Sequence, residues 1–401
     1  MSRKPQVAIV VQRYGAEIAG GSESLARAVA ERLASDHEVT VLTTCARDYV
    51  SWKNELPEGA RRENGVEVLR FPVERERDLA SFNRTSESLY ARTRSEADEL
   101  DWLRRQGPDV PRLVRRLEAD RDRYSAVLFF TYLYFPTYWG LRAAPERSIL
   151  VPTAHDEPPL GLSIYRLVFE TPRAFVFCSS AERELVRRRF EIGARPEEVA
   201  GIGIEVPAAT DVEGFRIRHD VRGPYALYAG RIDAGKGCEE MLEFFGRYRA
   251  SVRGGAQLLL IGRLVMPEPG VPGVRYLGYL SEAEKFAAMA GASAVVCPSP
   301  FESLSIVLLE AMAYGTPVLA TARSAVLEDH CHRSNAGLFY RNAPEFVEAL
   351  DLLVTHRELA QALGENGRRY VAEGYRWDVV MEKYRRAIAA VAGARGSGAP
   401  D

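Results

Sequence analysis

Two glutamates, Glu302 and Glu310, frame a junction between an apolar run and a helical stretch. Residues 294–298 (AVVCP) predict a strand, and residues 305–314 predict a helix, which is followed by the helix-ending sequence GTP. A helix that begins at the carboxyl end of a parallel strand offers unpaired backbone amides to an anion. The amides expected at this junction are those of Ser303, Leu304 and Ser305.

Glu310 follows the apolar run IVLL within the expected helix. A carboxylate in such surroundings is costly unless another group satisfies it. Hydroxyls of a ribose or a sugar would do so, and a backbone partner without any ligand is the alternative. We favour the hydroxyls.

A second cluster lies in YALYAGRIDAGKGCEE, where residues 225–229 predict a strand and a helix is expected to begin near Cys238. The loop between them carries Arg231 and Lys236 among glycines. Such a loop suits a diphosphate, because glycine lets the backbone approach and the cations offset the charge. The loop nearly matches a P-loop, but Gly237 stands where Ser or Thr would bind Mg²⁺, which disfavours a P-loop enzyme.

Three weaker signals lie elsewhere. Gly20 and Gly21 at an expected helix start, with Ser22 as the N-cap, would form another close-approach loop for an anion. His155 lies just past a strand end in VPTAHDEPP, where a structural and a functional role are both open. Residues 330–332 (HCH) are metal-ligand types without a second cluster at zinc spacing, so we interpret them as a polar loop.

Short apolar runs alternate with amphipathic stretches along almost the whole chain. This alternation predicts an α/β protein with parallel sheets covered on both faces. Two such series predict two Rossmann-like domains at residues 1–207 and 208–377, with a last helix at about 378–391. The charged helical segment 83–122 is either a solvated insertion or a lid over an acceptor, and residues 392–401 predict a disordered tail.

Composition excludes several classes of function. The 401 residues carry a formal net charge of −2, so no charge footprint points to nucleic acid. No stretch is long and apolar enough for a bilayer-spanning helix or a signal-peptide core, so we expect a cytoplasmic enzyme. The five cysteines are scattered and odd in number, which favours buried free thiols in a reducing compartment.

Over essentially its whole length, the sequence resembles family four of the retaining glycosyltransferases. The motifs are E-x7-E, present as Glu302 to Glu310 followed by AMAYGTPV, and G-R-x4-K-G, present as GRIDAGKG. The resemblance implies the GT-B fold, in which two Rossmann-like domains face each other across a central cleft and the last helix packs back on the N-terminal domain. Ser305, where many members have Gly, and GIGIE at 201–205 depart from the family pattern, which leaves the donor open.

The resemblance also implies roles for individual residues. Arg231 and Lys236 would bind the diphosphate and steady the departing nucleotide. Glu302 would contact hydroxyls of the donor sugar, and Glu310 would hold the ribose hydroxyls. His155 would lie beside the anomeric centre or the primary hydroxyl of the sugar.

The candidate site is therefore specified residue by residue. The backbone expected to contact the base belongs to Tyr279 and Leu280. The expected catalytic residues are His155, Arg231, Lys236 and Glu302. The expected donor-binding residues are Gly20, Gly21, Arg231, Lys236, Arg263, Tyr279, Leu280, Glu302, Ser303, Leu304, Ser305 and Glu310.

The expected function is retaining transfer of a hexosyl unit from a UDP- or GDP-sugar to a hydroxyl of a glycan, a lipid-linked or a small-molecule acceptor. No cofactor and no metal ion are expected, because fixed positive charge would stand in for the ion. A GT-B nucleotide-sugar epimerase, a phosphorylase and a non-catalytic nucleotide-sugar-binding protein are the alternatives. A helical cluster could also contact an anionic membrane at the cytoplasmic face through Arg104, Arg105, Arg112, Arg115 and Arg116.

Overall fold

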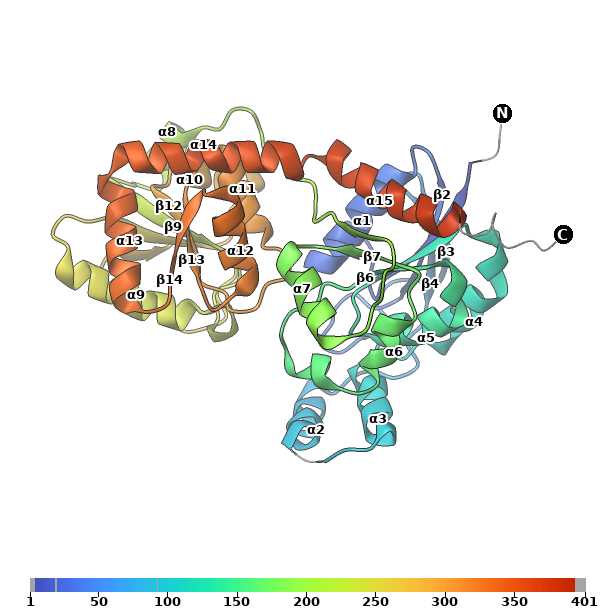
Figure 1. The fold of residues 1–401 in the computed structure, drawn as a ribbon. Coiled ribbons are helices and arrows are strands. Elements are labelled where there is room, and N and C mark those ends of the chain that lie inside the picture. Colours follow the sequence, from blue (N-terminus) through green and yellow to red (C-terminus); the bar gives the residue numbers. More distant parts are fainter. Residues whose placement is uncertain (1–3, 19, 92, 394–401) are drawn as a thin grey trace. The chain divides into compact units, whose positions relative to one another are not determined.

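The computed structural model describes residues 4–18, 20–91 and 93–393, and these form two compact units (Figure 1). Unit 1 consists of the described parts of Met1–Ala200 and Met381–Asp401, and unit 2 is Gly201–Val380. The boundary expected near residue 207 lies in the segment 201–211, which has no regular secondary structure. Most of the tail expected at 392–401 lies outside the described residues.

Unit 1 is built around an eight-stranded sheet in the order β3-β4-β2-β1-β5-β6-β7-β8. Neighbouring strands are parallel except β3, which runs antiparallel to β4. Every residue of β5 (Ala126–Phe130) is buried, the pattern of a parallel strand covered on both faces. The other strands are β1 (Gln6–Val10), β2 (Glu38–Thr44), β3 (Gly59–Glu63), β4 (Val66–Phe71), β6 (Ser148–Val151), β7 (Ala174–Phe177) and β8 (Glu197–Val199).

Helices cover this sheet, and the segment expected as an insertion forms three of them. α2 and α3 lie against each other at one end of unit 1 (Figure 1). Trp102 of α3 and Leu117 of α4 are buried in the core of unit 1, so the segment is part of that core. The helices are α1 (Gly21–Leu33), α2 (Leu79–Ala91), α3 (Glu96–Gln106), α4 (Pro111–Asp120), α5 (Phe135–Ala143), α6 (Tyr165–Glu170) and α7 (Ser180–Arg189), with 3-10 turns at Arg121–Arg123, Pro145–Arg147 and Pro158–Gly161.

Unit 2 contains a six-stranded, fully parallel sheet in the order β11-β10-β9-β12-β13-β14. Its strands are β9 (Tyr225–Ala229), β10 (Gln257–Ile261), β11 (Val274–Tyr276), β12 (Ala294–Cys297), β13 (Val318–Thr321) and β14 (Gly337–Tyr340). Its helices are α8 (Val212–Arg218), α9 (Cys238–Ser251), α10 (Glu282–Ala290), α11 (Ile306–Tyr314), α12 (Ala325–Ser334), α13 (Ala343–Thr355) and α14 (Arg357–Gly374), with a 3-10 turn at Ala234–Lys236. Two doubly wound α/β units are therefore present, as the alternating pattern predicted.

The strand order creates a topological switch point in each sheet. In unit 1 the chain leaves β1 toward β2 on one side and returns to β5 on the other. In unit 2 it leaves β9 toward β10 and returns to β12. Ligands of open parallel sheets bind beyond the carboxyl ends of the strands at such points.

The last helix, α15 (Trp377–Gly393), begins in unit 2 and continues into unit 1. In unit 1 its Tyr384 is fully buried, and Arg385 lies 2.6 Å from Asp36. Arg386 donates to Glu198 at 2.7 Å. These contacts attach the end of the described chain to unit 1.

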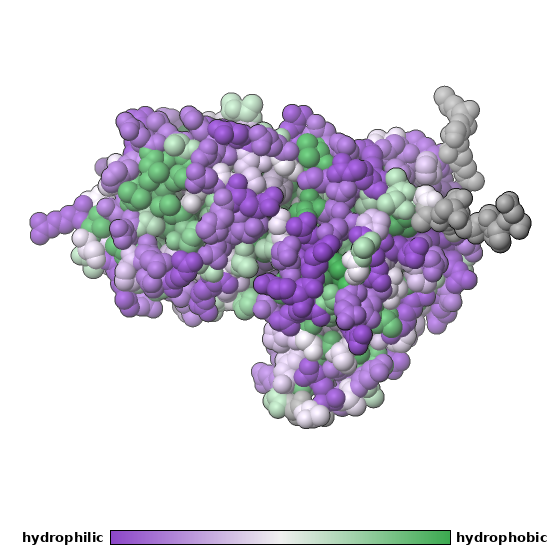
Figure 2. All heavy atoms as spheres, viewed as in Figure 1, coloured by the Kyte–Doolittle hydropathy of each residue, from purple (hydrophilic) through white to green (hydrophobic). Residues whose placement is uncertain are grey.

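The distribution of side chains between interior and surface is that of an ordinary globular protein. All five cysteines are buried and unpaired, as expected. The face of the molecule in Figure 2 is mainly hydrophilic, and its largest apolar group lies over unit 2, at the left of the view.

Candidate active site

The loop after β9 is shaped by an aspartate and a glycine. Asp233 Oδ1 accepts the amide of Lys236 at 2.9 Å, which caps the short turn Ala234–Lys236. Gly237 adopts a left-handed conformation with φ of 74°, and a Cβ there would collide with the carbonyl oxygen of Pro298. Glycine is required on both grounds. The loop therefore packs directly on the end of β12.

This packing joins the two sequence motifs. Lys236 Nζ lies 2.9 Å from Glu302 Oε1, and 36% of the lysine side chain is exposed. Arg231 pairs with Asp233 and is 48% exposed. Both cations expected at the diphosphate are therefore open to a ligand at the switch point between β9 and β12.

The turn between Glu302 and α11 carries the expected amides. Ser305 precedes the helix in a left-handed conformation, with φ of 65°. That conformation costs a non-glycine residue roughly 1–2 kcal/mol. Within the described part of the chain, no hydrogen bond occupies the amides of Ser303, Leu304 and Ser305. An N-terminus with these free amides is suited to an anion.

Glu310 is held by a residue that the sequence analysis missed. Its Oε1 lies 3.0 Å from Nζ of Lys285 in α10, and its Oε2 is buried and has no partner among the described residues. Burial raises the pKa of Glu310, and the nearby Lys285 charge opposes that shift. The alternative of a backbone partner is not seen at this carboxylate. Its unsatisfied oxygen is an acceptor available to a hydroxyl donor.

The interpretation of residues 330–332 as a polar loop was wrong, because they lie inside α12. His330 is 1% exposed, and burial lowers its pKa to about 4. Its Nε2 lies 3.0 Å from the carbonyl oxygen of Leu304, and its Nδ1 lies 3.0 Å from the hydroxyl of Tyr370. The helix begins after Ser324, whose side chain accepts the amide of Leu327, a capping signal present in the sequence.

The remaining donor-site candidates of unit 2 lie on neighbouring loops of the same sheet edge. Arg263 follows β10, and its carbonyl accepts the amide of Ile232 at 2.9 Å. Tyr279 is 84% exposed in the loop between β11 and α10, and Leu280 follows it. The carboxyl edge of this sheet therefore gathers all ten unit 2 candidates.

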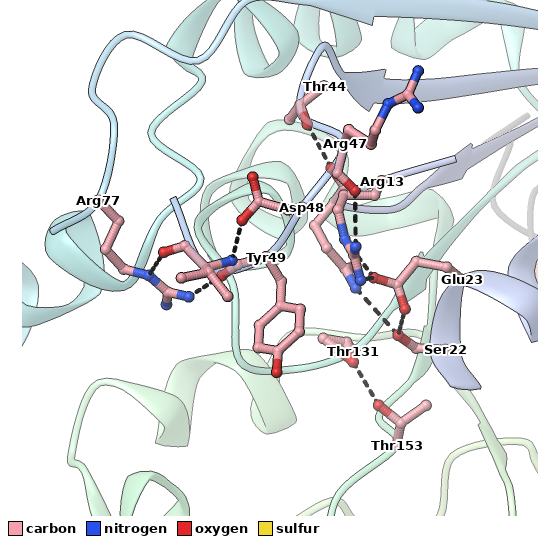
Figure 3. A network of polar contacts seen from close by, with 12 residues as sticks. Arg13, Ser22, Glu23, Thr44, Arg47, Asp48, Tyr49, Arg77, Thr131 and Thr153 are labelled. Carbon is pink, nitrogen blue, oxygen red and sulfur yellow. Dashed lines mark hydrogen bonds and ion pairs between the residues drawn. The ribbon is translucent and has the colours of Figure 1, made fainter. Parts of the chain in front are cut away.

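In unit 1 the arginine beside the Gly20–Gly21 loop is already neutralised by an internal ion pair (Figure 3). Arg13 and Glu23 are both buried, and Arg13 Nε donates to Glu23 Oε1 at 2.9 Å. Ser22 lies in the first turn of α1 and donates to Glu23 at 2.9 Å, so the expectation that it is the N-cap was wrong. The N-cap is Gly20, where a Cβ would collide with the Glu23 carboxylate.

Two threonines at the same edge of unit 1 carry backbone strain. Thr131 follows β5 with φ of 69°, and Thr153 follows β6 with φ of 50°. Their hydroxyls face each other at 2.5 Å (Figure 3). A β-branched residue at positive φ is an outlier, and such residues cluster at functional sites.

His155 lies in the loop after β6, two residues beyond Thr153. Its Nε2 is 3.3 Å from Glu157 Oε2, and Glu157 also accepts the hydroxyl of Tyr132 at 2.7 Å. The loop is anchored by Glu182 of α7, which accepts the amides of Ala154 at 2.6 Å and Cys178 at 2.5 Å. Burial raises the pKa of Glu182 to about 7 against these two donors. This carboxylate was not predicted from the sequence.

Each unit therefore carries candidate residues at the carboxyl edge of its own sheet. The whole chain also resembles HepE of Anabaena in complex with UDP and glucose, with a TM-score of 0.69 and 13% identity over 96% of this chain and 100% of that one. Together with the two doubly wound units, this similarity shows the GT-B fold.

The sequence comparisons report similarity to glycosyltransferases over part of the chain. Residues 211–370, which lie within unit 2, match the model described as Glycosyl transferases group 1. Glycogen synthase of Thermus thermophilus is 34% identical over 180 residues, 43% of this chain and 40% of that enzyme. Phosphatidyl-myo-inositol mannosyltransferase of Mycobacterium leprae is 29% identical over 309 residues, 71% of this chain and 78% of that enzyme. The chain thus spans less than half the length of the glycogen synthase that it matches.

Proposed function

We propose that the protein is a retaining glycosyltransferase that moves a hexosyl unit from a UDP- or GDP-sugar to a hydroxyl of a glycan, a lipid-linked or a small-molecule acceptor. The supporting observation is the switch point of unit 2, where the accessible Lys236–Glu302 pair adjoins three free amides. The similarity to a protein in complex with UDP and glucose supports a uridine donor.

The Lys236–Glu302 pair is suited to exchange for a ligand. An ion pair exposed to this extent contributes roughly 0–1 kcal/mol to stability. A diphosphate that replaces Glu302 as the partner of Lys236 therefore breaks an interaction of low free energy. Lys236 and Arg231 then bind the phosphates, and the amides before α11 complete the anion site. Glu302, released from the lysine, accepts hydroxyls of the donor sugar.

Glu310 supplies the other end of the donor site. Its unpartnered Oε2 accepts a ribose hydroxyl, while Lys285 continues to hold Oε1. The backbone at Tyr279 and Leu280 contacts the base, and Arg263 lies on the loop beside it. His155 is the catalytic candidate of unit 1.

The proposed reaction is a front-face transfer. The acceptor oxygen forms its bond to the anomeric carbon as the bond to the diphosphate oxygen breaks, and the departing phosphate takes the acceptor's proton. Both bonds lie on one face, so the configuration is retained. Lys236, Arg231 and the helix amides absorb the charge that develops on the phosphate, which makes a metal ion unnecessary. A double displacement would need Glu302 as nucleophile, whereas the proposal uses it to hold hydroxyls.

A thermal-shift panel tests the proposed function directly. UDP, GDP, ADP and their sugars are added to the full chain at concentrations well above their dissociation constants. A ligand at 100 times its dissociation constant adds about 2.7 kcal/mol of stability, so a true donor raises the melting temperature measurably. Absence of a shift with every nucleotide would contradict the proposal, and release of free sugar from the donor without an acceptor would indicate an epimerase.

Membrane contact is the least supported part of the expected partners. Among the residues that the structure describes, no helix is long and apolar enough to cross a bilayer. Three of the candidate arginines are paired: Arg105 with Asp101 at 2.6 Å, Arg112 with Glu58 at 2.7 Å and Arg116 with Asp120 at 2.6 Å.

These pairs reduce the charge available to a lipid surface. We therefore predict that the protein does not float with anionic liposomes. Salt-sensitive flotation, absent with neutral liposomes, would contradict this and would support a membrane-bound acceptor.

A further inference from the structure

A chain of polar groups inside unit 2 ends at the turn that precedes α11. His330 lies between the Leu304 carbonyl and the Tyr370 hydroxyl, each 3.0 Å from a ring nitrogen. The Tyr370 hydroxyl lies 3.3 Å from that of Tyr375, and the Tyr375 carbonyl accepts the amide of Ile204 at 2.7 Å. The chain thus connects the turn with the segment that leads into unit 2.

The partners of His330 determine its tautomer. The Leu304 carbonyl can only accept, so Nε2 must carry a proton. The ring is buried and neutral, so Nδ1 is bare and must accept from the Tyr370 hydroxyl. Tyr370 has then used its only hydrogen, and Tyr375 donates to Tyr370. One proton arrangement satisfies every group.

The same contact determines which way one peptide unit faces. In a trans peptide the carbonyl and the amide point in opposite directions, and the Leu304–Ser305 bond is trans. His330 holds the Leu304 carbonyl toward α12, so the Ser305 amide points away from α12. Ser305 has φ of 65° without being glycine, so an opposing constraint is needed to keep this strained orientation.

We propose that His330 is a positioning residue, which fixes the Leu304–Ser305 peptide so that the Ser305 amide faces the phosphate of the donor. This inference rests on the proposed function, because it takes the turn before α11 as the phosphate site. His330 touches neither donor nor acceptor and acts only through the backbone that it holds. Its role is to pre-organise a donor of charge-assisted hydrogen bonds.

The test compares His330→Leu with His330→Gln in the full chain, and His332→Leu serves as the matched control. Gln can donate to the Leu304 carbonyl and accept from Tyr370, whereas Leu can do neither. His332 lies in the same helix, and its side chain is 63% exposed. Removal of one hydrogen-bond donor to developing charge costs roughly 10²–10³ in kcat, so a backbone amide that is present but no longer held in place should cost roughly 10- to 100-fold. We expect that loss in His330→Leu, with a smaller change in KM for the donor, and near wild-type turnover in the other two variants.

A binding measurement separates this idea from a purely structural role. With serine labelled with ¹⁵N, addition of UDP should shift the Ser305 amide proton strongly in the wild type and in His330→Gln, and weakly in His330→Leu. Equal turnover and equal amide shifts in His330→Leu and His330→Gln would overturn the proposal. If UDP and GDP bind to no form of the protein, the proposed function fails instead.

A measurement on the wild type covers the case in which His330→Leu does not fold. The chain has six histidines, so their imidazole ¹⁵N signals can be assigned one by one. The proposal requires His330 to carry its proton on Nε2 and to have a bare Nδ1 at neutral pH, with or without a nucleotide. The opposite tautomer, or a doubly protonated ring, would overturn it.

Discussion

At the scale of single residues, the site is a set of charges that satisfy one another until a ligand arrives. Lys236 pairs with Glu302, and Arg231 pairs with Asp233. Such exposed pairs contribute little to stability, so replacing either carboxylate partner by a ligand phosphate costs little free energy. The buried Glu310 differs, because removal of its partner would leave a charge without compensation.

Lys236→Ala should lower kcat more than it weakens nucleotide binding, because charge on the leaving phosphate is greatest in the transition state. We expect kcat to fall roughly 100-fold and the dissociation constant of UDP to rise by less than about 10-fold. Steady-state kinetics and calorimetry measure the two effects, with the exposed Lys53→Ala as the control. Unchanged turnover would remove Lys236 from the reaction.

Lys285→Met should destabilise unit 2 because it leaves the buried Glu310 carboxylate without its charged partner. Breaking a buried pair costs roughly 3–5 kcal/mol, and this pair retains some exposure, so a loss of about 3 kcal/mol is expected. Adding Glu310→Gln to Lys285→Met should recover part of that loss and weaken nucleotide binding. Urea unfolding gives the stability, and a double variant less stable than Lys285→Met would argue against the pairing.

At the scale of secondary-structure elements, one helix in each unit carries a side chain that hydrogen-bonds the backbone of a candidate functional loop. Glu182 of α7 binds the amides of the loop that carries His155, and His330 of α12 binds the carbonyl of Leu304. Neither group faces a ligand in the proposed reaction. Both convert a loop into a fixed surface by satisfying backbone groups that regular secondary structure leaves unpaired.

The pKa of Glu182 gives this anchoring a pH dependence. The native pKa of about 7 lies above the ordinary value of 4.5, so the native state holds a proton that the unfolded state releases. The stabilisation is complete below pH 4.5 and is lost as pH rises to about 7, a change of roughly 3 kcal/mol. Glu182→Gln should remove this slope, whereas Glu184→Gln, on an exposed position of the same helix, should keep it. Amide exchange of β6 and β7 measures it, and parallel slopes in both variants would contradict the assignment.

The sequence predicted elements well and long-range partners poorly. Buried parallel strands such as β5 are continuous apolar runs, so their existence can be read directly. The pairing of Lys285 with Glu310 joins two helices, and no local periodicity reports it. The prediction of a loop at His330 was wrong because a short polar string does not distinguish a loop from a helix, although Ser324 marks a helix start. The strain at Thr131 and Thr153 arises from tertiary structure and has no sequence signal.

At the scale of the whole molecule, the two units share one architecture and carry different chemistry. Unit 2 holds accessible cations and free amides at its switch point. Unit 1 holds a neutralised Arg13–Glu23 pair and strained hydroxyls at the corresponding place. This difference accords with the proposal that unit 2 binds the charged donor.

Transfer should proceed with retention at the anomeric carbon and without a metal ion. The reason is that fixed cations and amides can absorb the charge of the leaving phosphate. The proton coupling of the anomeric hydrogen in the product gives the configuration, and assays with EDTA test the metal. Inversion would exclude the front-face reaction, and activity that EDTA abolishes and Mn²⁺ restores would refute metal independence.

The division of α15 between the units has a consequence for synthesis. A chain made from its N-terminus completes the contiguous unit 2 before Met381 emerges from the ribosome, yet Tyr384 and Ile388 belong to the buried interior of unit 1. The unit that is made second is therefore the first that can finish folding. Unit 1 cannot complete its core until α15 has been translated. Among the described helices, α15 is the last to be made.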